Sequence, residues 1–191
     1  MKKILSIGLA AMMLCLPFSV YAEEPEANNE IGIMGTYTET GYSNAVLGYE
    51  ITAQEGVSFS NVDSICKING FNTDLNIEDQ AFIAMYKNRT VPVLSMEWPD
   101  SNKSISINMN YMGDEVTADQ IYEELEANVE YVKSDLESYG YENISVEIQD
   151  YQFDGTTIKT VHSSYTDEGE TYVLRQIPVL KSGLLFIGTS A

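Results

Sequence analysis

The sequence is poor in the residues that most often carry enzyme chemistry. Its 191 residues include 2 Cys, 1 His and 1 Trp. Cys15 lies in the apolar N-terminal run, so removal of that run would leave Cys66 without a partner for an internal disulfide. We expect Cys66 to be a small buried hydrophobe, and we expect no zinc site with the usual Cys and His ligands.

Basic residues are also scarce: the sequence has 10 Lys+Arg against 29 Asp+Glu, which gives a net charge of −19. Such a surface repels nucleic acid, which is therefore excluded as an expected partner. A solubilising surface of an exported protein is the simplest explanation of the excess acid.

Motifs of the common enzyme classes are missing from the sequence. It contains no Gly-rich phosphate loop, no G-x-S-x-G elbow and no His-Glu-x-x-His. His162 lies within a predicted strand, where an ordinary histidine is favoured over a Ser-His-Asp triad. A small secreted hydrolase using Asp and Glu carboxylates is the alternative. With 29 acids, however, carboxylate pairs are inevitable and are no evidence for such an enzyme, so a protein without catalytic activity is favoured.

Residues 1–22 are predicted to be a signal peptide. Lys2 and Lys3 precede a mostly apolar run that is too short for a good membrane span. The end of the segment fits the signal peptidase rule, with cleavage between Ala22 and Glu23. A lipid anchor on Cys15 is disfavoured because the residues before it make a poor lipobox.

Cleavage would leave a secreted or extracytoplasmic protein without a stable membrane span. Removing Lys2 and Lys3 would leave 8 bases and 29 acids, a net charge of −21. Residues 23–41 are polar and acidic and are predicted to be a flexible tether. Residues 42–191 are predicted to form a single α+β domain.

The clearest structural signal is a long amphipathic helix over about 117–139. Thr117 and Gln120 form a predicted capping box, and Gly140 is the expected left-handed stop. One face of the helix is apolar at helical spacing. The other face carries an acidic stripe, which consists of Asp119, Glu123, Glu126, Glu130 and Glu137.

The remaining segments favour hairpins of an antiparallel sheet. Residues 93–98 and 104–111 make the best hairpin, and the second arm alternates apolar residues with Ser and Asn as a half-buried strand does. Other strands are predicted at 46–52, 57–59, 144–148, 158–165, 171–180 and 184–188. Short helices are predicted at 61–69 and 76–89, and for 76–89 a strand is the competing prediction. The predicted fold is α+β: one antiparallel sheet packed against the long helix, with shorter helices elsewhere.

Several of these segments together resemble a known family. After the long helix the chain reads Ser-Tyr-Gly-Tyr-Glu-Asn-Ile-Ser-Val-Glu-Ile over 138–148, then Phe-Asp-Gly over 153–155, then a strand pair ending in Leu-Leu-Phe-Ile over 184–187. With Tyr-Ser-Asn at 42–44, Leu-Gly-Tyr at 47–49 and Gly-Val-Ser-Phe at 56–59, this pattern resembles small exported Firmicutes proteins with a PsbP-like α/β/α sandwich. The resemblance covers most of 42–191 and implies that fold. Better-known members such as the photosystem extrinsic protein imply a binding or accessory role.

The sequence therefore favours an exported, non-catalytic binding or accessory protein of the bacterial envelope or extracellular space. Its ligand is an unknown protein, peptide or glycan. No catalytic, cofactor-binding or metal residue is assigned, although calcium would suit the acidic loops at 100–102 and 113–115, neither of which completes a known spacing. The candidate binding surface consists of Trp98, next to a predicted turn, and of Glu123, Glu126 and Glu130 in the acidic stripe, which could dock a basic partner.

Overall fold

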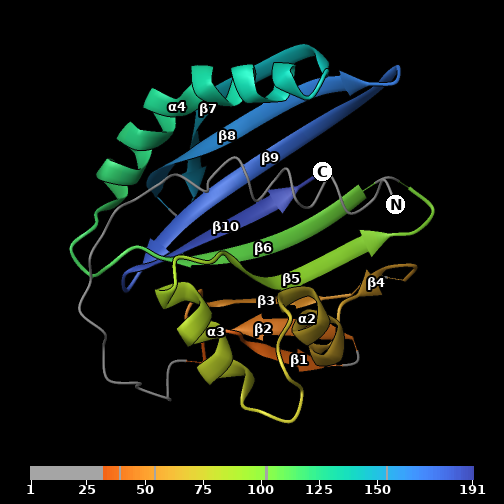
Figure 1. Ribbon diagram of the computed structural model, residues 1–191, viewed down its shortest axis with the longest axis vertical. Coiled ribbons are helices and arrows are strands. Elements are labelled where there is room, and N and C mark those ends of the chain that lie inside the picture. Colours follow the sequence, from red (N-terminus) through yellow and green to blue (C-terminus); the bar gives the residue numbers. More distant parts are fainter. Residues whose placement is uncertain (1–31, 39, 54, 102, 154) are drawn as a thin grey trace.

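The structure, a computed structural model, describes residues 32–38, 40–53, 55–101, 103–153 and 155–191. The predicted signal peptide, the cleavage site between Ala22 and Glu23 and the first part of the predicted tether lie outside these residues. The described chain is α+β, with two antiparallel sheets and three helices (Figure 1). In this part of the chain, no helix is both long enough and apolar enough to cross a membrane.

The larger sheet has seven strands in the order β4-β5-β6-β10-β9-β8-β7. The strands are β4 (Ser58–Phe59), β5 (Val91–Trp98), β6 (Lys103–Tyr111), β7 (Glu142–Phe153), β8 (Thr156–Asp167), β9 (Glu170–Lys181) and β10 (Leu184–Ser190). The smaller sheet has the order β1-β2-β3, with β1 (Thr36–Thr38), β2 (Gly41–Asn44) and β3 (Tyr49–Thr52). The helices are α2 (Val62–Asn69), α3 (Ile77–Tyr86) and α4 (Ala118–Ser138).

The large sheet separates two hydrophobic cores. Side chains alternate between the faces of a strand, and in β10 Leu184 and Phe186 enter the first core while Leu185 and Ile187 enter the second. The first core also contains residues of α2, α3 and the small sheet, and the second contains residues of α4. Figure 1 shows α4 on one side of the large sheet and α2, α3 and the small sheet on the other.

Local capping explains where the two short helices begin. The Asn61 side chain accepts the Ser64 N–H at 2.9 Å at the start of α2, and Gly70 ends that helix with φ of 69°. The Asn76 side chain accepts the Glu78 N–H at 2.8 Å at the start of α3. The helix expected at 61–69 is confirmed, and the competition at 76–89 is resolved as a helix over Ile77–Tyr86.

The capping box of α4 is also confirmed. The Gln120 N–H donates to Thr117 Oγ1 at 3.3 Å, and the Thr117 N–H donates to Gln120 Oε1 at 2.9 Å. Gly140 follows the helix with φ of 85°. Three residues of the predicted apolar face, Ile121, Leu125 and Leu136, are buried in the second core with sheet residues such as Val146 and Val161.

The small sheet differs from the sequence prediction, which expected a single sheet and a domain beginning at Tyr42. Ile33 and Met34 are at most 1% exposed, and β1 lies inside the stretch predicted as a tether. Ile33, Met34 and Tyr37 therefore pack with the domain. The predicted strand at 46–52 is formed only from Tyr49, after a turn at 45–48.

Tertiary contacts hold these short strands in place. The Tyr37 hydroxyl donates to the Val93 carbonyl, which joins β1 to β5 of the large sheet. The Asn44 amide donates to the Tyr42 hydroxyl at 2.9 Å and to the Ile33 carbonyl at 3.0 Å. Burial raises the pKa of Tyr42 to about 12, so its hydroxyl stays protonated.

Truncating α4 in the second core should destabilise the protein. Leu125 is 5% exposed, and Leu125→Ala is expected to lower the free energy of unfolding by about 2–5 kcal/mol through lost burial and the cavity left behind. Urea unfolding followed by circular dichroism measures this change. The same substitution at Leu75, which is 60% exposed, is the control and should change stability by less than about 0.5 kcal/mol. Equal effects of the two substitutions would contradict the packing of α4 described above.

Removing the helix cap should have a smaller effect. Thr117→Ala is expected to cost about 1 kcal/mol, because the Gln120 N–H loses its acceptor, whereas Thr117→Ser retains the hydroxyl and should be nearly neutral. Thermal unfolding of the two variants tests this, and a loss of stability in the serine variant as large as in the alanine variant would count against the capping box.

Candidate functional site

A row of buried polar side chains lies on the face of the large sheet that faces the second core. Strand register places Ser95 beside Ser106, Ser106 beside Thr189 and Thr189 beside Gln176 across four strands. Asn108 lies two residues along β6 from Ser106, on the same face. We call this set the polar floor; its members, each between 0% and 8% exposed, are Ser95, Ser106, Asn108, Gln176 and Thr189.

The polar floor corrects the prediction for β6. Its Ser and Asn residues were expected to face solvent as the polar side of a half-buried strand, yet Ser106 is 7% exposed and Asn108 is 1% exposed. The physical reason is that both faces of β6 are covered: Ile107 and Met109 lie in the first core, and the opposite face is buried on the side of the second core.

Two members of the polar floor have polar atoms that no described residue satisfies. Neither amide atom of Asn108 has a hydrogen-bond partner in the described part of the chain, and the Thr189 hydroxyl has none there either. A buried polar group without a partner costs on the order of 1–3 kcal/mol, so native proteins keep few of them. Asn108 and Thr189 are on adjacent strands, which concentrates this cost in one place.

The polar floor continues into a pocket beside α4. Gln176 belongs to both, and the rest of the pocket lining is apolar apart from one asparagine. From α4 come Leu125, Asn128, Val129 and Val132, and from β7 and β8 come Val146, Ile148 and Val161. The free volume of about 10 Å³ is that of one water molecule, so in this structure the pocket is a narrow gap between α4 and the sheet.

The pocket and the polar floor have no ionisable side chain. A hydrolase acting through carboxylates would be supported by Asp or Glu with a raised pKa in such a pocket. Burial raises the pKa of Glu78, but Glu78 Oε1 accepts the Met34 N–H at 3.0 Å and lies on α3, on the other side of the sheet. The partial burial of the Glu78 carboxylate is explained by this structural contact with the Met34 N–H.

The structure does not bring the predicted binding residues together. Trp98 ends β5 and packs against the first core, half-buried. The three glutamates lie on α4, whose core residues belong to the second core. Trp98 and the acidic stripe therefore lie on different sides of the large sheet and form separate surfaces.

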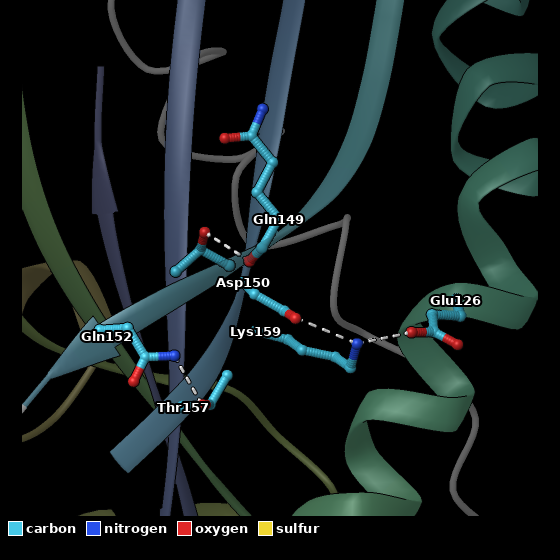
Figure 2. A network of polar contacts seen from close by, with 7 residues as sticks. Glu126, Gln149, Asp150, Gln152, Thr157 and Lys159 are labelled. Carbon is cyan, nitrogen blue, oxygen red and sulfur yellow. Dashed lines mark hydrogen bonds and ion pairs between the residues drawn. The ribbon is translucent and has the colours of Figure 1, made fainter. Parts of the chain in front are cut away.

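Within the acidic stripe, Glu126 is tied to the sheet. Lys159 of β8 pairs with Glu126 at 3.0 Å and with Asp150 of β7 at 3.3 Å, as Figure 2 shows. These contacts raise the pKa of Lys159. Glu130 pairs with Lys133 at 2.7 Å one helical turn away, and its side chain is 83% exposed. Glu123 is exposed.

Cys66 and His162 lie in separate environments. Cys66 is buried on α2, as expected, and burial raises the pKa of its thiol, which disfavours the reactive thiolate. His162 lies on β8, where its Nε2 is 3.0 Å from Thr160 Oγ1. Burial and the nearby Arg175 lower the pKa of His162, so the imidazole is neutral at pH 7.

Tyrosine rings pack mainly against one another. Tyr37 and Tyr42 lie 5.0 Å apart between ring centroids, and Tyr165 stacks on Tyr172 at 5.3 Å. Tyr42 and Tyr165 are buried in the two cores, and Tyr37 and Tyr172 pack against them, so these rings are not a free aromatic surface. In the described ranges, no three His, Cys, Asp or Glu side chains lie close enough together to hold a metal ion.

Comparison with known proteins adds no relative that would assign a function. No protein-family model matches the chain, and a search of curated proteins finds no significant match.

Proposed function

We propose that this chain is an exported, non-catalytic binding or accessory protein, whose ligand is a neutral peptide or glycan that reaches the polar floor when the elements covering that floor move apart. The observation that carries the proposal is that the buried side chains Asn108 and Thr189 have polar atoms with no hydrogen-bond partner among the described residues. An asparagine amide offers donors and an acceptor, and a hydroxyl offers both. Peptide backbone and sugar hydroxyls match this set, because they also present donors and acceptors without charge.

The surroundings of Asn108 and Thr189 support the same ligand class. Leu125, Val129 and Val132 of α4 line the gap beside the polar floor and would supply apolar contacts to a ligand once the gap widens. No charged group lies among the residues of the floor and pocket, so an ionic ligand would be buried there without a counter-charge. Export and release beyond the cell membrane rest on the signal sequence at 1–22.

The proposed fold assignment is the PsbP-like sandwich, with α4 as the long helix on one face. It is supported by the match of residue pattern over 42–191 and by the core shared by Leu125 and Val146. An accessory role without catalysis agrees with what is implied by that resemblance. Fold likeness alone does not transfer a ligand, so the ligand class rests on the polar floor.

A ligand of this class should stabilise the protein by mass action. At a concentration 100 times its Kd, a ligand that binds only the native state adds about 2.7 kcal/mol, which for a domain of this size raises Tm by roughly 5–10 °C. The measurement is thermal unfolding with chitotetraose, tri-alanine blocked at both termini by acetyl and amide groups, and calcium as probes. We expect a shift with a glycan or peptide probe and loss of that shift in Asn108→Leu.

The same substitution at a satisfied asparagine is the matched control. The Asn69 amide donates to the Ile65 and Pro92 carbonyls at 3.0 and 2.7 Å, so Asn69→Leu should destabilise the free protein by about 1–3 kcal/mol and keep the ligand shift. Asn108→Leu should leave the free protein as stable as before or more stable, because it removes an unsatisfied group. An unchanged shift in Asn108→Leu would rule out the polar floor, and a shift with calcium alone would overturn the ligand class.

A further inference from the structure

The two edges of the large sheet are protected to very different degrees. One edge is β4, which has 2 residues, and the other is β7, which has 12. Natural proteins commonly keep edge strands short because an unpaired edge is a template for another strand. Among the described strands β7 pairs only with β8, so its outer edge presents unpaired backbone groups.

The direction of the backbone groups along β7 follows from one contact. Thr160 Oγ1 of β8 donates to the Gln149 carbonyl at 3.1 Å, which places that carbonyl on the β8 side. In an antiparallel pair, successive residues direct their N–H and C=O alternately toward and away from the partner. The N–H and C=O of Ile148, Asp150 and Gln152 therefore lie on the outer edge.

The same edge carries charge of one sign. Glu142, Glu147 and Asp150 of β7 are exposed, and the strand contains no Lys, Arg or Pro. Lys159 pairs with both Asp150 and Glu126, and in this way it connects the edge to the acidic stripe of α4 (Figure 2). In a chain of net charge −19, these acids repel a second copy and attract a cationic strand.

We propose that the outer edge of β7 accepts an extended segment rich in Lys or Arg, from a protein partner, as an eighth strand of the large sheet. Backbone hydrogen bonds to Ile148, Asp150 and Gln152 supply the pairing. Because side chains alternate between the faces of a strand, bases on the α4 side of the added segment meet Asp150, whereas Glu147 lies on the opposite face. The surface is distinct from the polar floor, which lies on β5, β6, β9 and β10. The proposal therefore stands or fails independently of the neutral ligand.

A labelled ten-residue peptide in which lysine alternates with valine is the probe, measured by fluorescence anisotropy against the purified protein. We expect binding that weakens with salt, and no binding of the matched peptide with glutamate in place of lysine. Failure of the lysine peptide to bind at low salt would overturn the proposal.

Two variants of one residue separate strand pairing from simple charge attraction. Asp150→Ala and Asp150→Pro lose the same carboxylate, but only the proline variant also loses the outward N–H. We expect the Kd of Asp150→Pro for the peptide to be about ten times that of Asp150→Ala, which corresponds to a difference in binding free energy of about 1.4 kcal/mol. Equal binding would show that charge alone attracts the peptide and would overturn strand addition. Gln152→Pro and Gln152→Ala form a second pair, with the same expectation, should Asp150→Pro fail to fold.

Hydrogen exchange gives an independent readout at single residues. In the free protein, the Ile148 and Asp150 amides should exchange quickly because they face outward, whereas the Gln149 amide should be protected by β8. The lysine peptide should slow exchange at Ile148 and Asp150 by at least about tenfold, corresponding to 1.4 kcal/mol or more, and leave Gln149 unchanged. Unchanged exchange at both outward amides in the presence of bound peptide would contradict the proposal.

Discussion

The structure depends on the burial of both faces of one strand. β10 lies between β6 and β9, and consecutive residues from Leu184 to Ile187 enter opposite cores. A strand that is apolar on both sides must be covered twice, so α4 on one face and the layer of α2, α3 and the small sheet on the other satisfy a single requirement. The polar floor lies on these same central strands, and for this reason neutral side chains such as Asn108 are buried there.

The elements that the sequence predicts well are those with local signals. The capping box of Thr117 and Gln120, the Asn61 and Asn76 caps and the alternation in β6 each depend on residues a few positions apart, and each marks an element found in the structure. The small sheet could not be predicted in this way. Its strands have 3 or 4 residues, and their stability depends on contacts over long separations, such as that of Tyr37 with Val93.

The candidate site was missed because alternation does not distinguish a solvated face from a buried polar one. Asn108 and Ser106 have the spacing of an exposed strand face, and only the packing of the folded protein shows that this face is buried. The sequence signal for the polar floor is limited to the Ser and Asn residues of β6, a strand that lies in the middle of the large sheet. The acidic stripe, in contrast, was found at the sequence level, but its connection through Lys159 to the edge of β7 required the structure.

The position of β10 also sets the order in which the protein can fold. β5 and β6 are synthesised early and β7, β8 and β9 later, yet these two groups of strands meet only through β10, which follows all of them in the chain. Until residues 184–190 are available, the large sheet consists of two separate halves, and the contacts that join them span long stretches of sequence. Folding of such a topology is slow, because the entropy of closing long loops is lost before the central pairing forms. Until then β6 and β9 each have an unpaired edge, and β10 closes both edges in a single step.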